Sequence, residues 1–222
     1  MRGSDELCRG AVSCVVILVA VACAAPAPTP GTSGRGDMTA ASGAEGKIAR
    51  GRFLVITHGC GDCHGGGANP AAAGWLAGVQ GDGPADSFKI GPFTTRARNL
   101  TPDNTTGLGR FTERQIFNAL RYGLRPGETP DVEITSTTPG EGNFPVRPKY
   151  LAVPMPWPAW RHMPDPDLMA IAAYLKRAVK PVSHRVADSE GPPDFWASEY
   201  TVAKIGPHPA PRFPTANEVA PR

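Results

Sequence analysis

The apolar positions of this chain recur most clearly at helical spacing, in three separated stretches. In the first, Ile48, Phe53 and Ile56 fall on one face of a helix that ends near His58. Gly51 lies inside this helix and costs about 1 kcal/mol relative to alanine. A close crossing with a second helix would offset that cost, because a missing Cβ lets another backbone approach.

The second and third helices are indicated by their ends as well as by their apolar faces. Thr112 and Gln115 form a capping box, and Gly123 ends the second helix. The third begins at Asp165-Pro166-Asp167, with acidic residues at the positive end of the helix dipole, and ends in basic residues near Lys180. The apolar residues of the two helices are Ile116, Phe117, Leu120, Leu168, Ile171, Ala172 and Leu175.

Turn-forming residues dominate the remaining sequence. The 26 Gly and 25 Pro together exceed a fifth of the 222 residues, well above average usage. We expect long loops at 65–100 and 124–150, a short helix around 70–76 and no strand. The predicted fold class is all-α, a small helical domain over 47–185, followed by a Pro-rich C-terminal tail at 186–222.

The N-terminal segment 1–23 predicts export from the cytoplasm. The apolar run Ala11–Ala22 is too short for a comfortable bilayer span and is typical of a signal peptide. Cys23 directly follows this run, so a lipoprotein signal with a lipidated Cys23 and ordinary cleavage after a small residue both stay open. Residues 24–46 are rich in Ala, Pro, Gly, Ser and Thr, which predicts a flexible linker.

Charge and cysteine content narrow the function. The net charge is only +3 and evenly spread, without the basic stripe that nucleic-acid binding requires. Three of the five cysteines fall within the first 23 residues, so only Cys60 and Cys63 belong to the predicted domain.

The segment Cys60-Gly61-Asp62-Cys63-His64 carries the clearest chemistry. Two thiols separated by two residues can form thioether bonds to the two vinyl groups of a haem, and the adjacent His64 can then bind the iron as proximal ligand. We therefore predict one covalently bound haem c. A redox dithiol would need a βαβ setting, a zinc site would need a second ligand pair, and a disulfide would close a strained loop.

Six segments, in order along the chain, carry a resemblance to a known family. They are Arg50–Val55, Cys60–His64, Asn99–Gly109, Phe111–Gly123, Met155–Pro158 and Asp167–Leu175. They resemble bacterial class-I-like c-type cytochromes related to the cytochrome subunits of periplasmic alcohol and aldehyde dehydrogenases. Subunits of that kind often carry three haem motifs, whereas this chain has one.

The resemblance implies further site residues. Met155 matches the family's axial methionine and would be the distal iron ligand, with Met163 as the contender and His162 as the ligand of a bis-His alternative. Gly51 and Tyr174 match the positions where the first and last helices of this fold cross.

Contacts to the haem itself are also expected, each beside a simpler alternative. Asn99 and Thr101 would donate hydrogen bonds to a haem propionate, or else form an ordinary turn around Pro102. Trp157 would pack against the haem edge, or else belong to the core. Pro70 would supply the backbone carbonyl that receives the His64 Nδ1 proton.

These features predict an electron carrier in the periplasm, held at the membrane if Cys23 is lipidated. It would pass single electrons from a dehydrogenase or other donor to a terminal oxidase or another cytochrome, and would not be an enzyme itself. The alternative is a haem enzyme or a gas-sensing domain whose distal ligand dissociates.

Overall fold

The computed structural model describes residues 43–192 and 194–221, so the predicted signal peptide, Cys23 and nearly all of the predicted linker lie outside it. The elements in chain order are α1 (Ala44–Thr57), α2 (Cys60–His64), β1 (Phe88–Ile90), β2 (Phe93–Thr95), α3 (Glu113–Tyr122), α4 (Trp157–Trp160), α5 (Asp165–Arg177) and α6 (Val202–Ile205). Short 3-10 helices lie at Pro84–Asp86, Pro126–Glu128 and Phe195–Tyr200. Among these described helices, none has the length and apolar character that a bilayer crossing needs.

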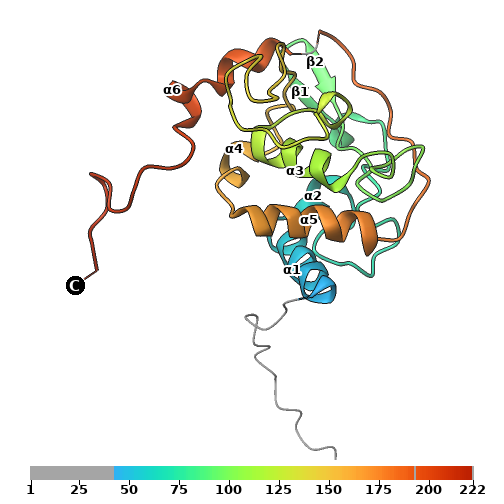
Figure 1. Ribbon diagram of the computed structural model, residues 1–222. Coiled ribbons are helices and arrows are strands. Elements are labelled where there is room, and N and C mark those ends of the chain that lie inside the picture. Colours follow the sequence, from blue (N-terminus) through green and yellow to red (C-terminus); the bar gives the residue numbers. More distant parts are fainter. Residues whose placement is uncertain (1–42, 193, 222) are drawn as a thin grey trace, which may run out of the picture. The chain divides into compact units, whose positions relative to one another are not determined.

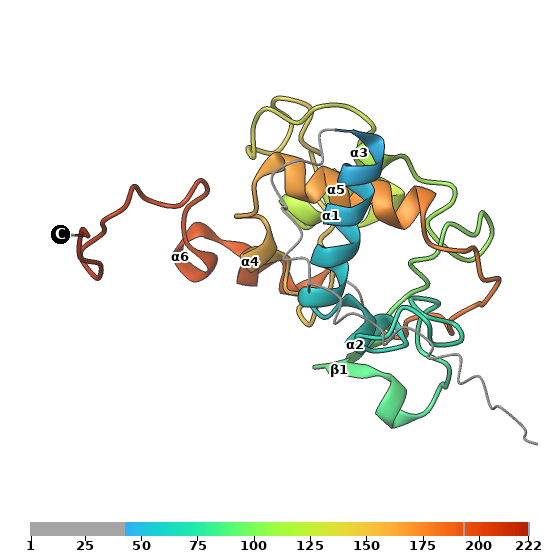
Figure 2. The ribbon, with the colours of Figure 1, turned by 90° about the horizontal axis from the view of Figure 1, so that it is seen from below.

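The long helices pack as α1, α5 and α3, with α5 in the middle (Figures 1 and 2). At the α1–α5 crossing, a Cβ added to Gly51 would lie 2.7 Å from Tyr174 Cβ and would overlap the carbonyl of Ala170. The predicted crossing of Gly51 and Tyr174 is therefore confirmed. A bidentate ion pair joins the same helices, with Arg50 nitrogens 2.9 and 2.8 Å from the carboxylate of Asp167.

The buried face of α1 differs from the predicted one. Gly51, Leu54 and Val55 are buried, whereas Phe53 is 42% exposed. The guanidinium carbon of Arg50 lies 5.4 Å from the ring centroid of Phe53. The prediction that Phe53 faces the core is wrong. Because Gly51 sits in the helix crossing, the contact face is centred on positions 51, 54 and 55, which share one side of a helix.

The ends of α3 agree with the sequence, whereas those of α5 differ in part. The capping box of Thr112 and Gln115 has both of its hydrogen bonds, and Gly123 takes the left-handed conformation at the end of α3. Helix α5 ends at Arg177. The N-cap residue of α5 is Pro164, so the predicted cap at Asp165 is wrong, and the side chain of Asp165 makes an ion pair with Arg121 instead. All seven apolar residues predicted to face inward from these two helices are buried.

Two local predictions are wrong. Residues 70–76 form a series of turns instead of a helix, and a hairpin pairs β1 with β2 in antiparallel register. The hairpin turn at Gly91 has φ +53°, a conformation that favours glycine. Helices still make up most of the regular structure, so the helical class is confirmed while the expectation of an all-α fold is not.

The segment after 185 also differs from an extended tail. It returns from α5 to the hairpin along the loops, as the orange segment of Figure 1 shows. Trp196 is 2% exposed and lies 5.0 Å from Phe93, ring centroid to ring centroid. Further on, Arg161 donates to the carbonyl oxygens of Ile205 and Gly206 at 2.7 and 2.9 Å. The chain is therefore packed on the domain well beyond residue 186.

Candidate haem site

The two thiols of the haem motif lie on one turn of helix. Gly59, with φ +66°, separates α1 from α2, and Cys60 and Cys63 follow it three residues apart on the same short helix. Both are free cysteines, Cys60 buried and Cys63 exposed. The motif thus follows a helix instead of a strand, which is not the setting of a redox dithiol.

Cys60 belongs to the main apolar core. Its cluster contains Leu54 and Val55 of α1, Leu76 of the following loop and apolar residues of α3 and α5. This burial raises the pKa of the Cys60 thiol to about 12. Dithiol redox catalysis needs a thiolate near neutral pH, and Cys60 is neutral there. A haem bonded at Cys60 would instead be held against an apolar wall.

The ring of His64 is fixed by a backbone group. Its Nδ1 lies 2.6 Å from the carbonyl oxygen of Arg98, and since a carbonyl only accepts, Nδ1–H is the donor. The Nε2 lone pair is then free to bind iron. Burial lowers the pKa of His64, partly opposed by the Arg98 carbonyl, and the neutral imidazole is the form that ligates metal.

The carbonyl that accepts from His64 belongs to Arg98 and not to the predicted Pro70. The prediction that Pro70 receives the His64 proton is wrong, because His64 Nδ1 is bonded to the carbonyl of Arg98. The Asn-Leu-Thr-Pro segment that begins at Asn99 carries a sequence signal, whereas its neighbour Arg98 carries none, because only its backbone carbonyl contacts His64.

Both candidate distal methionines lie at the edge of the main apolar core. Met155 and Met163 are half-buried and pack against the apolar cluster that contains Cys60. Trp160, which lies between them, meets His58 edge to face at 6.1 Å between ring centroids. The segment 155–163 therefore lies next to the end of α1, and the choice between the two methionines stays a prediction. His162 is exposed, 5.3 Å from the ring of His208.

Asn99 and Thr101 are buried and engaged within the protein. The Asn99 amide donates to Thr106 Oγ1 at 3.0 Å and to the carbonyl of Val182 at 2.8 Å. Its oxygen accepts from the backbone and hydroxyl of Thr101 at 2.9 and 2.7 Å. These contacts support the turn alternative, and the propionate role of Asn99 stays a prediction.

Trp157 is 4% exposed and belongs to an aromatic group. Its ring stacks on Tyr150 at 6.0 Å and meets Tyr200 at 4.9 Å, and it covers Gly123 at the end of α3. Its indole Nε1 is buried with no hydrogen-bond partner within the described ranges. This enclosure among aromatic rings agrees with the core alternative, and the haem-edge role of Trp157 stays a prediction.

Known proteins resemble this chain over part of its length. A fructose dehydrogenase cytochrome subunit of Gluconobacter japonicus is 31% identical over 144 residues, 65% of this chain and 24% of that protein. A gluconate 2-dehydrogenase cytochrome c subunit of Pantoea cypripedii is 27% identical over 146 residues, 65% of this chain and 26% of that protein.

This chain is related to dehydrogenase cytochrome c subunits. A diheme cytochrome c-type protein of Cereibacter sphaeroides is also similar, 30% identical over 92 residues, 41% of this chain and 29% of that protein. No family model matches the chain. The chain spans about a quarter of the length of these relatives. The resemblance seen in the motifs is confirmed, and a cytochrome c relationship agrees with haem c at the Cys60–His64 motif.

Proposed function

We propose that this protein is a mono-haem c-type cytochrome that carries single electrons and performs no substrate chemistry of its own. The observation that carries the proposal is the turn of helix that presents Cys60 and Cys63 beside a His64 whose Nδ1 is already bonded to the Arg98 carbonyl. Thioether attachment and an oriented imidazole are the two requirements of such a site. The kinship with cytochrome c subunits supports the same conclusion.

Each site residue has a distinct task in this proposal. Cys60 and Cys63 would hold the ring covalently, and His64 Nε2 would bind the iron. When bound, haem c supplies an iron that exchanges one electron between ferrous and ferric states. Met155 would be the distal ligand; it lies on a turn in which its backbone N–H donates to the carbonyl of Ala152 at 2.9 Å. Trp157 would pack against the edge of the ring.

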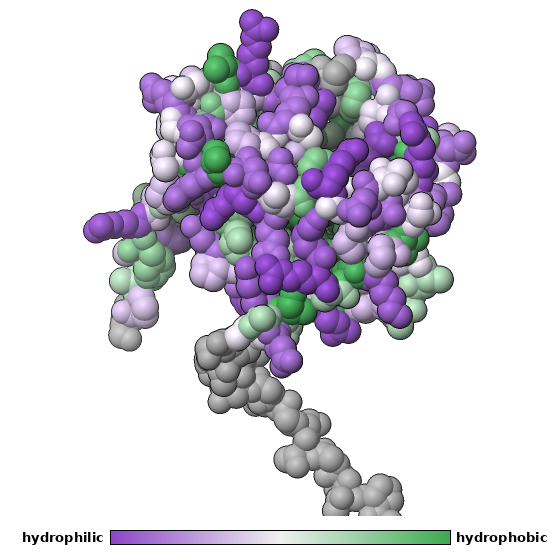
Figure 3. All heavy atoms as spheres, turned by 45° about the vertical axis from the view of Figure 1, so that its right-hand side comes forward, coloured by the Kyte–Doolittle hydropathy of each residue, from purple (hydrophilic) through white to green (hydrophobic). Residues whose placement is uncertain are grey.

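Location and partners follow from the same reading. The signal-like segment at 1–23 would export the protein to the periplasm, with lipid at Cys23 as the means of membrane attachment. A periplasmic dehydrogenase would be the donor, and a terminal oxidase or another cytochrome the acceptor. The face seen in Figure 3 is mostly hydrophilic with scattered apolar residues, and such a surface suits the small, transient contacts of redox partners.

The test separates a carrier from a haem enzyme or gas sensor. The protein is produced in a host that attaches haem c, and the ferric spectrum is inspected for the weak red band of methionine–iron ligation. Carbon monoxide is then added to the ferrous protein. We expect the band, slow binding of carbon monoxide, and loss of the band in Met155→Leu but not in Met163→Leu. A missing band with rapid carbon monoxide binding in the unmodified protein would overturn the carrier function.

A further inference from the structure

The hydrogen bond between His64 Nδ1 and the Arg98 carbonyl lies among several chain segments that are bonded side by side. The carbonyl of His64 accepts from Gly78 N at 2.8 Å, and the carbonyl of Leu76 accepts from Leu100 N at 2.8 Å. Segment 76–79 thus lies between the haem motif and segment 96–100, which carries the Arg98 carbonyl. Gly78 has φ +90°, and an added Cβ would overlap Val186, so a further segment closes this stack.

That further segment is residues 182–190, which we call the strap. It begins after α5 and runs antiparallel to 94–101. At one end, Thr94 and Glu190 exchange two backbone hydrogen bonds of 2.9 Å. At the other end, Val182 N donates to Thr101 Oγ1 at 3.1 Å and its carbonyl accepts from Asn99.

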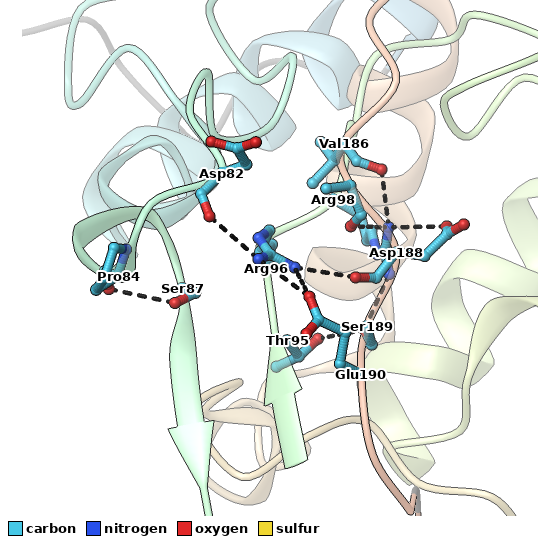
Figure 4. A network of polar contacts seen from close by, with 11 residues as sticks. Asp82, Pro84, Ser87, Thr95, Arg96, Arg98, Val186, Asp188, Ser189 and Glu190 are labelled. Atoms are coloured by element: carbon cyan, nitrogen blue, oxygen red, sulfur yellow. Dashed lines mark hydrogen bonds and ion pairs between the residues drawn. The ribbon is translucent and has the colours of Figure 1, made fainter.

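Arg98 is tied to the middle of the strap, as Figure 4 shows. Its Nη1 donates to the carbonyl oxygens of Val186 and Ala187 at 3.1 and 2.9 Å. Its Nη2 donates to Ser189 Oγ at 2.9 Å. Three directed bonds from a planar guanidinium fix both the side chain and the peptide that carries it.

Arg96 repeats this arrangement two residues earlier. Its guanidinium donates to the carbonyl oxygens of Asp188 and Asp82 at 2.9 and 3.1 Å (Figure 4). The side chains of Arg96 and Arg98 therefore both lie toward the strap, while the Arg98 carbonyl accepts from His64. The same residue links the strap to the motif.

We propose that the strap is the positioning element for the haem ligand His64, because it holds Arg98 and thereby the carbonyl that accepts the Nδ1 proton. The inference rests on the proposed function. A strong bond at Nδ1 makes the imidazole a better donor to iron and favours the ferric state, so it lowers the reduction potential. Arg98 is a positioning residue, as are the strap residues that bind it.

The sign of the effect distinguishes positioning from charge. Loss of a positive charge near the iron would favour the ferric state and lower the potential, whereas a loosened Nδ1 bond would raise it. Arg98→Lys keeps the charge but cannot reproduce the three bonds, and Ser189→Ala changes no charge at all. Arg147→Lys and Ser183→Ala make the same replacements at exposed positions and serve as controls.

The experiment compares the holoproteins by redox titration and by NMR measurement of His64 Nδ1–H exchange. For Arg98→Lys we expect a shift of roughly threefold to tenfold toward the ferrous state, at most about 59 mV upward, with faster Nδ1–H exchange. Ser189→Ala should move both quantities in the same direction by less, and neither control should move them. Ser189→Ala also carries the test if Arg98→Lys does not fold.

Two contrary results have different meanings. Unchanged potential and exchange in both Arg98→Lys and Ser189→Ala, with haem still attached, would overturn the inference and leave the electron-carrier function standing. An unmodified protein that attaches no haem would overturn the proposed function, and the inference with it.

Discussion

The haem motif is supported on two sides by regions of different physical character. On one side, α1 crosses α5 through a glycine, and the contact is apolar and close enough to exclude a Cβ at Gly51. On the other side, the strap is joined to 94–101 by arginine, asparagine and threonine side chains that bind mainly backbone oxygens. The first support fixes where the thiols lie, and the second fixes the carbonyl that orients His64.

Because of this difference, the helix crossing and the strap should respond differently to amino-acid substitutions. Close packing is sensitive to side-chain volume, because interiors leave little room to adjust. Bonds to backbone carbonyls are insensitive to the identity of the accepting residue but sensitive to loss of the donor, which leaves buried polar groups unpaired. Substitutions in the two regions should therefore differ in their effects on stability and on haem properties.

The largest effect is expected where the chain beyond the strap is anchored. Trp196→Ala should lower the free energy of unfolding by about 3–5 kcal/mol, because the side chain is almost fully buried against Phe93. Urea unfolding measures this, with Phe213→Ala, at a 60% exposed position, as the control expected to change stability by less than about 0.5 kcal/mol. Equal and small effects would mean that this region hangs free.

Overpacking the helix crossing should come next. Gly51→Val should cost about 1–3 kcal/mol, because the new side chain meets the Ala170 carbonyl and Tyr174. Gly127→Ala is the matched control, since nothing lies within 4 Å of its added Cβ. Thermal unfolding of both variants decides the matter, and a Gly51→Val protein as stable as the control would show that α1 and α5 do not approach closely.

Asn99 tests whether the strap side is structural or touches haem. Asn99→Ala should destabilise the protein by about 1–3 kcal/mol, because Val182 and Thr101 lose buried partners. Its spectrum and haem attachment should persist. A variant with normal stability but altered propionate titration would favour the propionate role instead.

The smallest effect is expected at the ion pair of the helix crossing. Asp167→Asn should cost at most about 1 kcal/mol at neutral pH, because the pair is partly exposed. The hydrogen bond from Arg50 lowers the pKa of Asp167, so its contribution is present at neutral pH and is lost as the pH falls through that lowered pKa. The variant and the parent should converge in stability in strong acid, whereas Glu141→Gln, at an exposed position, should follow the parent throughout.

The sequence predicted the first region well and the second poorly. Apolar spacing predicted helices α1, α3 and α5, and the capping box at Thr112 predicted the start of α3. Gly51 inside α1 predicted the helix crossing. These features are visible in the sequence because side-chain identity determines the contacts. The sequence does not predict the strap, because its carbonyl acceptors have no sequence signature and most of its residues are polar, as in a loose tail. The Cys60–His64 motif could be predicted because covalent haem attachment requires those residue types. The hydrogen-bond acceptor for His64 could not, because it is the backbone carbonyl of Arg98 and depends only on the path of the backbone.

Covalent attachment of one haem at Cys60 and Cys63 is the property on which the proposed function depends most directly. The protein should be matured in a host competent for cytochrome c assembly, extracted with acid–acetone and analysed by mass spectrometry of the peptide that contains the motif. We expect the pigment to stay with the protein and the peptide to carry one haem. Colourless protein, pigment released into the solvent, or a motif peptide with two free thiols would contradict the assignment.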